Sequence, residues 1–157
     1  MDSGNLWGEL EGVDLEINTP KEILQEQAKF LPRLTKDLLY AEIKELEDRE
    51  LYNSFDYVLD EIDEDDPNPN SNHGFAYKFL LKSRFMDTYR FELFRLHHGI
   101  GIYPVTIRLD NDIQKELQLP GTYKEIESEE DFVEFISKVL QSLRVKRVIV
   151  ALMKLSR

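Results

Sequence analysis

The sequence predicts an α+β fold, with N-terminal helices, a three- to four-stranded antiparallel β-meander and two C-terminal helices packed on one sheet face. Apolar residues recur at helical spacing near both ends of the chain. Between them, residues 75–109 alternate between apolar and polar side chains in three runs joined by short turns, which is typical of antiparallel strands. With 157 residues, of which 41% are hydrophobic, the chain is expected to fold as a single domain, residues 1–157.

The first predicted element is a helix that follows a loop or an edge strand in residues 1–18. Thr19 is a suitable N-cap, and Pro20 suits the first helical position because its missing amide hydrogen is not needed there. Pro32 clashes with the preceding helical turn, so the helix is expected to kink or restart at that residue.

An acidic helical segment is predicted to continue beyond this proline. Leu34, Leu38 and Ala41 follow one another at helical spacing, which predicts a charged helix as far as Arg49. Residues 55–62 fit a further amphipathic helix, although the alternation of their aromatic and apolar side chains also permits a strand.

A loop of residues 64–74, rich in Asp, Asn and Pro, is predicted to separate the acidic helical part (residues 19–63) from a β-meander (residues 75–127). The alternation places aromatic and aliphatic side chains on one face of the predicted sheet. The expected strands are residues 75–82, 89–94 and 103–109, with residues 122–127 as a candidate fourth strand.

The C-terminal part, residues 128–157, is predicted to form two helices. Ser128 is an N-cap followed by three acids, and apolar residues then recur at helical spacing. Ser142 is expected to cap the last helix, although the β-branched residues that follow it also permit a strand. A short additional helix is expected to start after Asp110.

Acidic residues are concentrated in residues 41–66. This stretch has twelve acids and two bases, which leaves −10 of the formal net charge of −11. Such a surface attracts basic partners and rejects acidic ones. The leading prediction is therefore a non-catalytic protein-binding module, such as an immunity protein, an antitoxin-like inhibitor or a subunit of a larger complex with a basic partner. The residues expected to contact that partner are Glu42, Glu45, Glu47, Asp48 and Glu50.

Two other interpretations of the surface stay open. The acids of residues 41–66 can simply be solvated, because charged runs commonly form the exposed side of a helix or an irregular loop. A sheet face that leaves apolar side chains uncovered would indicate a homodimer or a stable complex with another protein.

Aromatic and basic residues interleave in the predicted meander, which suggests binding of RNA or single-stranded DNA as an alternative function. Residues 73–80 also resemble the RNP1 strand of RRM proteins at Gly74, Phe75 and Ala76, and depart from it at Lys78. The net charge of −11 opposes binding to phosphates. The residues that would form this surface are Tyr77, Lys78, Phe79, Tyr89, Arg90, Phe91 and Arg95.

His97 and His98 suggest a second alternative, a histidine-dependent hydrolase. Neighbouring residues on a strand point to opposite faces, so these two rings are not expected to share a metal ion. The chain contains no cysteine, no Gly-x-Ser-x-Gly elbow and no Walker lysine motif. The sequence therefore predicts no metal ion, no cofactor and no enzymatic activity.

The composition also predicts a cytoplasmic location. The absence of cysteine fits a reducing compartment, and residues 1–15 lack the basic and apolar regions of a secretory signal. The longest unbroken apolar run, residues 148–153, has six residues, far fewer than the roughly 20 that a membrane-spanning helix needs.

Overall fold

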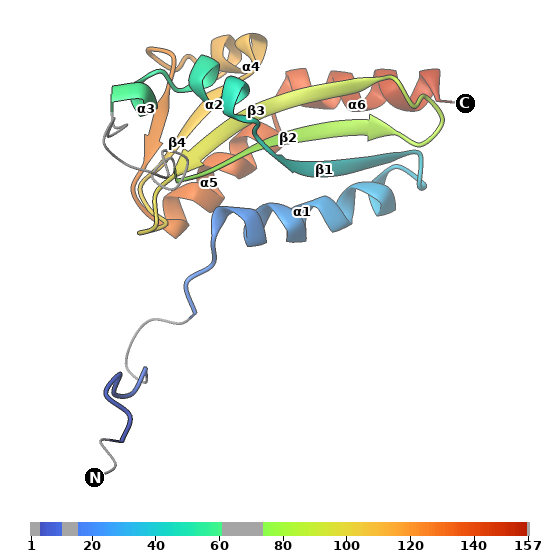
Figure 1. Ribbon diagram of the computed structural model, residues 1–157. Coiled ribbons are helices and arrows are strands. Elements are labelled where there is room, and N and C mark those ends of the chain that lie inside the picture. Colours follow the sequence, from blue (N-terminus) through green and yellow to red (C-terminus); the bar gives the residue numbers. More distant parts are fainter. Residues whose placement is uncertain (1–3, 11–15, 61–73, 157) are drawn as a thin grey trace.

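The computed structural model describes residues 4–10, 16–60 and 74–156, and the fold is given for these residues (Figure 1). The α+β class predicted from the sequence is confirmed, with five strands in place of the three or four expected. In chain order the elements are α1 (Pro20–Leu34), β1 (Leu39–Glu45), α2 (Asp48–Ser54), α3 (Tyr57–Asp60), β2 (Phe75–Ser83), β3 (Arg90–His98), β4 (Val105–Leu109), α4 (Asn111–Glu116), β5 (Lys124–Ile126), α5 (Glu129–Leu140) and α6 (Leu143–Leu155).

The strands form one antiparallel sheet in which their order along the chain is also their order in space. The predicted meander therefore gains one further strand, β1, at one edge. The candidate fourth strand is observed as β5 and forms the other edge. In the observed register, Ile43, Phe79, Phe94 and Leu109 form a row across four neighbouring strands. Such a row stacks large side chains on one face of the sheet, because directly paired residues point to the same side.

Different helices cover the two faces of this sheet (Figure 1). We call the face that packs against α1, α5 and α6 the inner face; it contains Phe79 and Phe94 and forms the main core. The packing of both C-terminal helices on one face is as predicted. The opposite, outer face lies under α2 and α3, where Leu51, Phe55 and Val58 form a smaller cluster.

Helix α1 begins as predicted but ends differently. The Thr19 hydroxyl accepts a hydrogen bond from the backbone N–H of Glu22 at 3.1 Å, and Pro20 is the first helical residue. The restart that was one of the two outcomes predicted at Pro32 does not occur, because α1 continues through this residue and ends at Leu34. Thr35 closes it, since its hydroxyl donates to the carbonyl of Leu31 at 2.9 Å.

The charged helix predicted to reach Arg49 is also wrong, because its central part is strand β1. Leu39, Ala41 and Ile43 recur at every second position, and Leu39 and Ile43 also fit a helix. Alternation prevails because the segment pairs with β2. In the region 55–62, where helix and strand were both open, the described residues are helical from Tyr57 to Asp60.

The C-terminal helices start at the predicted caps. The Ser128 hydroxyl accepts from the N–H of Asp131 at 3.2 Å, and the Ser142 hydroxyl accepts from the N–H of Val145 at 3.3 Å. The last element is therefore a helix, not the strand that its β-branched residues also permitted. Residues 4–10 and 16–18 contain no strand, and the predicted loop 64–74 lies outside the described residues except for Gly74.

Candidate binding groove

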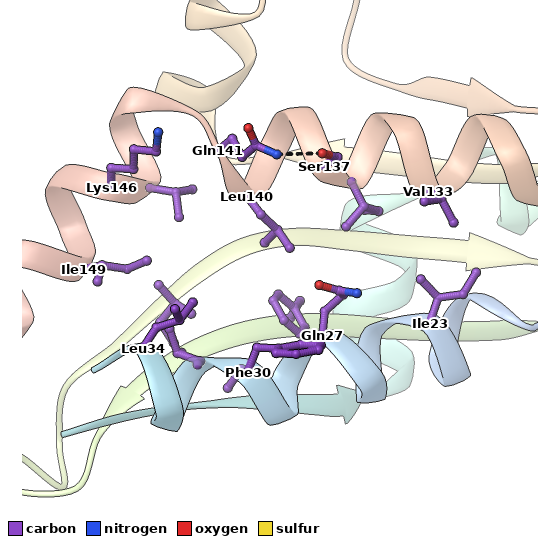
Figure 2. Close-up of a pocket in the computed structure, with 16 residues that line it drawn as sticks. Ile23, Gln27, Phe30, Leu34, Val133, Ser137, Leu140, Gln141, Lys146 and Ile149 are labelled. Carbon is purple, nitrogen blue, oxygen red and sulfur yellow. Dashed lines mark hydrogen bonds between the residues drawn. The ribbon is translucent and has the colours of Figure 1, made fainter. Parts of the chain in front are cut away.

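On the inner side a groove lies between α1 and the α5–α6 pair, with a volume of about 510 Å³ (Figure 2). Its floor is the inner face of the sheet at Phe79 and Leu81. Its walls are apolar side chains that face one another across the gap. These include Ile23, Phe30 and Leu34 from α1, Val133 and Leu140 from α5, and Ile149 from α6.

The rim of this binding groove exposes apolar side chains that the fold leaves uncovered. Phe30 is 47% exposed, Leu34 is 76% exposed and Val133 is 48% exposed. Leu31 beside them is only 8% exposed, so α1 is packed along one side and open along the other. Apolar surface left uncovered beside a hollow commonly marks a place where another molecule binds.

Few polar groups enter the binding groove. The side-chain amide of Gln141 donates to the Ser137 hydroxyl at 2.8 Å, so these two groups satisfy each other. Lys146 is the one charged side chain among the sixteen lining residues. Across the groove, the guanidinium of Arg33 lies 5.7 Å from the centre of the Phe30 ring. The arrangement suits an apolar segment that carries negative charge at its edge.

The outer face has the opposite character, because a row of bases crosses four strands. The register places Lys44, Lys78, Arg95 and Arg108 directly beside one another, and we call these four residues the basic row. Like charges in paired positions destabilise a sheet unless an acid compensates them. Glu92 of β3 pairs with Arg95, and a second compensating acid is supplied from α2, which lies over the row.

Glu50 of α2 is this compensating acid. Its carboxylate lies 2.5 Å from the Lys78 amine and 3.4 Å from the Arg95 guanidinium. Burial by itself raises the pKa of the Glu50 carboxyl, but hydrogen bonds from Lys78 and from the Glu47 backbone, with the charges of both bases, outweigh it and hold the pKa below its ordinary value. Glu50 is therefore ionised in the fold and used internally.

Only part of the predicted acidic contact surface stays exposed. Glu42 forms an ion pair with Lys82 on the neighbouring strand, so Glu42 and Glu50 both have partners within the chain. Glu45, Glu47 and Asp48 are exposed, and docking of a basic partner on them stays a prediction. Glu42 and Glu45 belong to strand β1 and not to the predicted helix, whereas Glu47 caps α2 and Asp48 and Glu50 lie in its first turn.

The residues of the nucleic-acid alternative are divided between the two faces. Tyr77 and Phe79 point inward and are 8% and 2% exposed, so nucleobases cannot stack on them. The neighbouring basic residues Lys78 and Arg95 point outward and form ion pairs with Glu50. Strand pairing places the remaining members likewise: Phe91 on the inner face, Arg90 on the outer face, and Tyr89, 42% exposed, just before β3.

His97 and His98 point to opposite faces of β3, as predicted. The Nδ1 atom of His97 lies 2.9 Å from the Tyr57 hydroxyl, and Nδ1 of His98 lies 2.8 Å from the carbonyl of Gly99. Burial lowers the pKa of His98, which is 6% exposed and stacks on Phe75. Neither ring lines the binding groove, and the two do not form one site.

Within residues 4–10, 16–60 and 74–156, no group of three or more His, Asp or Glu residues is arranged to hold a metal ion. Among the same residues, no helix is both long enough and apolar enough to cross a membrane.

Comparison with protein-family models, with curated proteins and with solved structures gives no match to this chain. Its function must therefore be inferred from the geometry of its own surface. On that surface the binding groove combines volume, exposed apolar side chains and a charged rim.

Sequence reasoning missed the binding groove, although a signal for it exists. Phe30 and Val133 lie outside the core-facing stripes of their helices, yet both are apolar. Apolar residues that widen a helix face beyond its core stripe indicate a second contact. The pattern does not reveal whether that contact lies within the chain, because the spacing of α1 and α5 depends on the whole fold.

Proposed function

We propose that the protein is a non-catalytic protein-binding module that holds an apolar segment of a partner in the binding groove. The observation that carries this proposal is the groove of about 510 Å³ with Phe30, Leu34 and Val133 exposed along its rim. Partner proteins commonly use such grooves by inserting the apolar side of a helix or an extended segment. An immunity protein, an antitoxin-like inhibitor or a subunit of a cytoplasmic complex is the biological form we propose.

The chemistry of the rim defines the segment that fits. Apolar side chains at helical spacing would enter between α1 and α5, and an acidic residue at one end would meet Lys146 or Arg33. This segment differs from the basic partner predicted from the acid count. Glu42 and Glu50, two of the acids on which that prediction depended, are engaged by Lys82 and Lys78.

A selection from a displayed peptide library against the purified protein tests the proposal. The selected peptides should share apolar residues spaced by three or four positions with a flanking acid. They should lose binding to the variant Val133→Asp, which places a charge at the rim of the groove. Val150→Asp is the matched control, because Val150 is also a half-exposed valine on a helix but does not line the groove.

The outcome is decided by the difference between these two variants. Peptides that bind the protein and its two variants equally would bind elsewhere and refute the groove as the site. A selection that returns no peptide above background would also count against the proposal. Circular dichroism of both variants should match that of the parent chain, since both substitutions are on the surface.

A further inference from the structure

The N-terminal arm, residues 4–10, exposes a cluster of large apolar side chains. Leu6 is 84% exposed, Trp7 is 94% exposed and Leu10 is 65% exposed. Figure 1 shows the arm lying away from the sheet and the helices. Trp7 is the only tryptophan of the chain, and tryptophan is the residue type most enriched at the energetic centres of protein interfaces. The arm therefore has the composition of a docking segment.

The arm is also shaped before it binds. The side-chain amide of Asn5 donates to the carbonyl of Gly8 at 3.0 Å, and the backbone N–H of Trp7 donates to Oδ1 of Asn5 at 3.0 Å. Gly4 and Gly8 have φ angles of 66° and 74°, which glycine adopts without strain. The resulting turn presents Leu6 and Trp7 together, so less conformational entropy is lost when they insert into a site.

The charge of the N-terminal region complements that of the binding groove. Residues 1–18 contain five acids and no base, whereas residues 142–157, which include α6, contain five bases and no acid. Lys146 of this basic segment lines the groove, and Arg33 lies over Phe30 at its rim. When two apolar surfaces carry opposite charges at their edges, the charges favour association of the surfaces and fix their relative orientation.

Asn18, which lies between the N-terminal arm and α1 in the chain, is fixed to the body. Both its backbone N–H and its side-chain amide donate to the Glu129 carboxylate, at 3.2 Å and 2.7 Å. The Tyr103 hydroxyl donates to the carbonyl of Asn18 at 3.1 Å. This attachment lies beside the start of α5, and Figure 1 shows residues 4–10 away from the helices of their own chain. The N-terminal arm is therefore open to a neighbouring molecule.

We propose that the N-terminal arm of one copy of this chain docks in the binding groove of a second copy, with Trp7 as the central contact. The inference rests on the proposed function, because it assigns an occupant to the same groove. A groove of about 510 Å³ lies within the size range of sites that enclose compact ligands, and it can take an indole ring with a neighbouring leucine. Reciprocal exchange of two arms gives a closed two-fold dimer.

Because Trp7 is the only tryptophan, the full chain reports on its own docking. Sedimentation should show a dimer whose tryptophan emission is shifted to shorter wavelength, and dilution should return both the monomer and the emission of an exposed indole. Trp7→Ala and Val133→Asp should each weaken dimerisation on the order of tenfold or more. Val150→Asp should leave it unchanged.

Three other results would each contradict the reciprocal docking of the N-terminal arms. A monomer with exposed tryptophan emission at every concentration shows that the arm docks nowhere. A monomer with shifted emission that Val133→Asp abolishes shows that the arm occupies the groove of its own chain. A dimer that survives both Trp7→Ala and Val133→Asp has its interface elsewhere.

The variant Trp7→Ala also separates this inference from the proposed function. Peptides selected on the parent chain should still bind this variant, because its binding groove is intact. If they bind it while no dimer forms at any concentration, the groove accepts partners but not a second copy. If peptides bind neither chain, the groove itself is not a docking site and both proposals fail.

Discussion

On the outer face of the sheet, basic side chains meet acids of the same chain, whereas on the inner side apolar side chains stay partly uncovered. In the basic row, Lys78 and Arg95 pair with Glu50 from α2 and Arg95 also pairs with Glu92, while Lys82 pairs with Glu42. On the inner side, α1 and the α5–α6 pair leave Phe30 and Val133 exposed across a groove. Two acids of the stretch that dominates the charge of the sequence, Glu42 and Glu50, are thus used within the fold, whereas the inner side leaves apolar side chains uncovered.

The comparison also explains why α2 carries acids. The Arg108 guanidinium donates to the carbonyls of Asn53 and Ser54 at 3.2 and 3.3 Å, and Arg95 donates to the Ser54 hydroxyl at 2.8 Å. The C-terminal end of α2 therefore accepts from the same row that Glu50 neutralises, in keeping with the negative end of a helix dipole. The helix is held on the outer face by these charged contacts together with the apolar cluster around Leu51 and Phe55. Four changes test how the two faces differ.

The largest effect is expected from the inner face. Phe94→Ala removes a ring that is 1% exposed and stacks on Phe79 at 5.4 Å, and should lower the free energy of unfolding by about 3–5 kcal/mol. Phe30→Ala is the control at the rim of the groove, where 47% exposure limits the loss to about 1 kcal/mol. Urea unfolding measures both, and equal losses would mean that the rim is as well packed as the core.

A smaller effect is expected on the outer face from Glu50→Gln. This change leaves Lys78 without its acid and Arg95 with Glu92 alone, and should cost about 2 kcal/mol at neutral pH. Because the pKa of Glu50 lies below its ordinary 4.5, the contribution is present above pH 4.5 and is lost as pH falls through the folded-state pKa. The variant should lack this acid-dependent loss in urea titrations. Glu45→Gln, an exposed control, should behave as the parent chain.

A third test uses the histidine on the inner face. Burial lowers the pKa of His98 below its ordinary 6.5. As pH falls, this histidine is therefore protonated in the unfolded chain before it is protonated in the folded chain, and the free energy of unfolding decreases below pH 6.5. His98→Phe keeps a ring against Phe75 but cannot titrate, so its unfolding midpoint should vary less between pH 7 and pH 5 than that of the parent chain. Equal slopes for the two chains would show that this ring is solvated.

The smallest effect is expected from Lys82→Gln, which removes the ion pair with Glu42. The side chains of this pair are 24% and 35% exposed, so water screens it and its loss should cost about 0.5 kcal/mol. Lys29→Gln is the control, since the pair of Lys29 with Glu26 is more than 60% exposed at both ends and should contribute nothing measurable. A loss for Lys82→Gln as large as that for Glu50→Gln would place both pairs in the same low-dielectric environment.

Local signals in the sequence were sufficient for most of the fold. Thr19, Ser128 and Ser142 mark helix starts because a cap depends only on the few residues that follow it. The alternation in β2 and β3 was equally local. The segment that became β1 was mistaken because Leu39 and Ile43 fit both periods, and pairing with a strand more than thirty residues away decides between them.

The candidate sites were harder to predict because they depend on contacts between distant residues. Glu50 and Lys78 are 28 positions apart, and no spacing rule indicates that one neutralises the other. The binding groove depends on the separation of α1 from α5, which local periodicity does not encode. Exposure of Trp7 was equally invisible, because a tryptophan in a short irregular segment is compatible with burial or with exposure.

Strand β1 has a neighbouring strand on one side only, which bears on aggregation. An edge strand offers its backbone to strands of other molecules and can start the growth of fibrils. In β1 the outward positions between the apolar ones include Glu42 and Lys44, and charges at an edge oppose the approach of a further strand. Replacing both with threonine would keep strand propensity while removing this protection, so the chain should become prone to form cross-β deposits at high concentration.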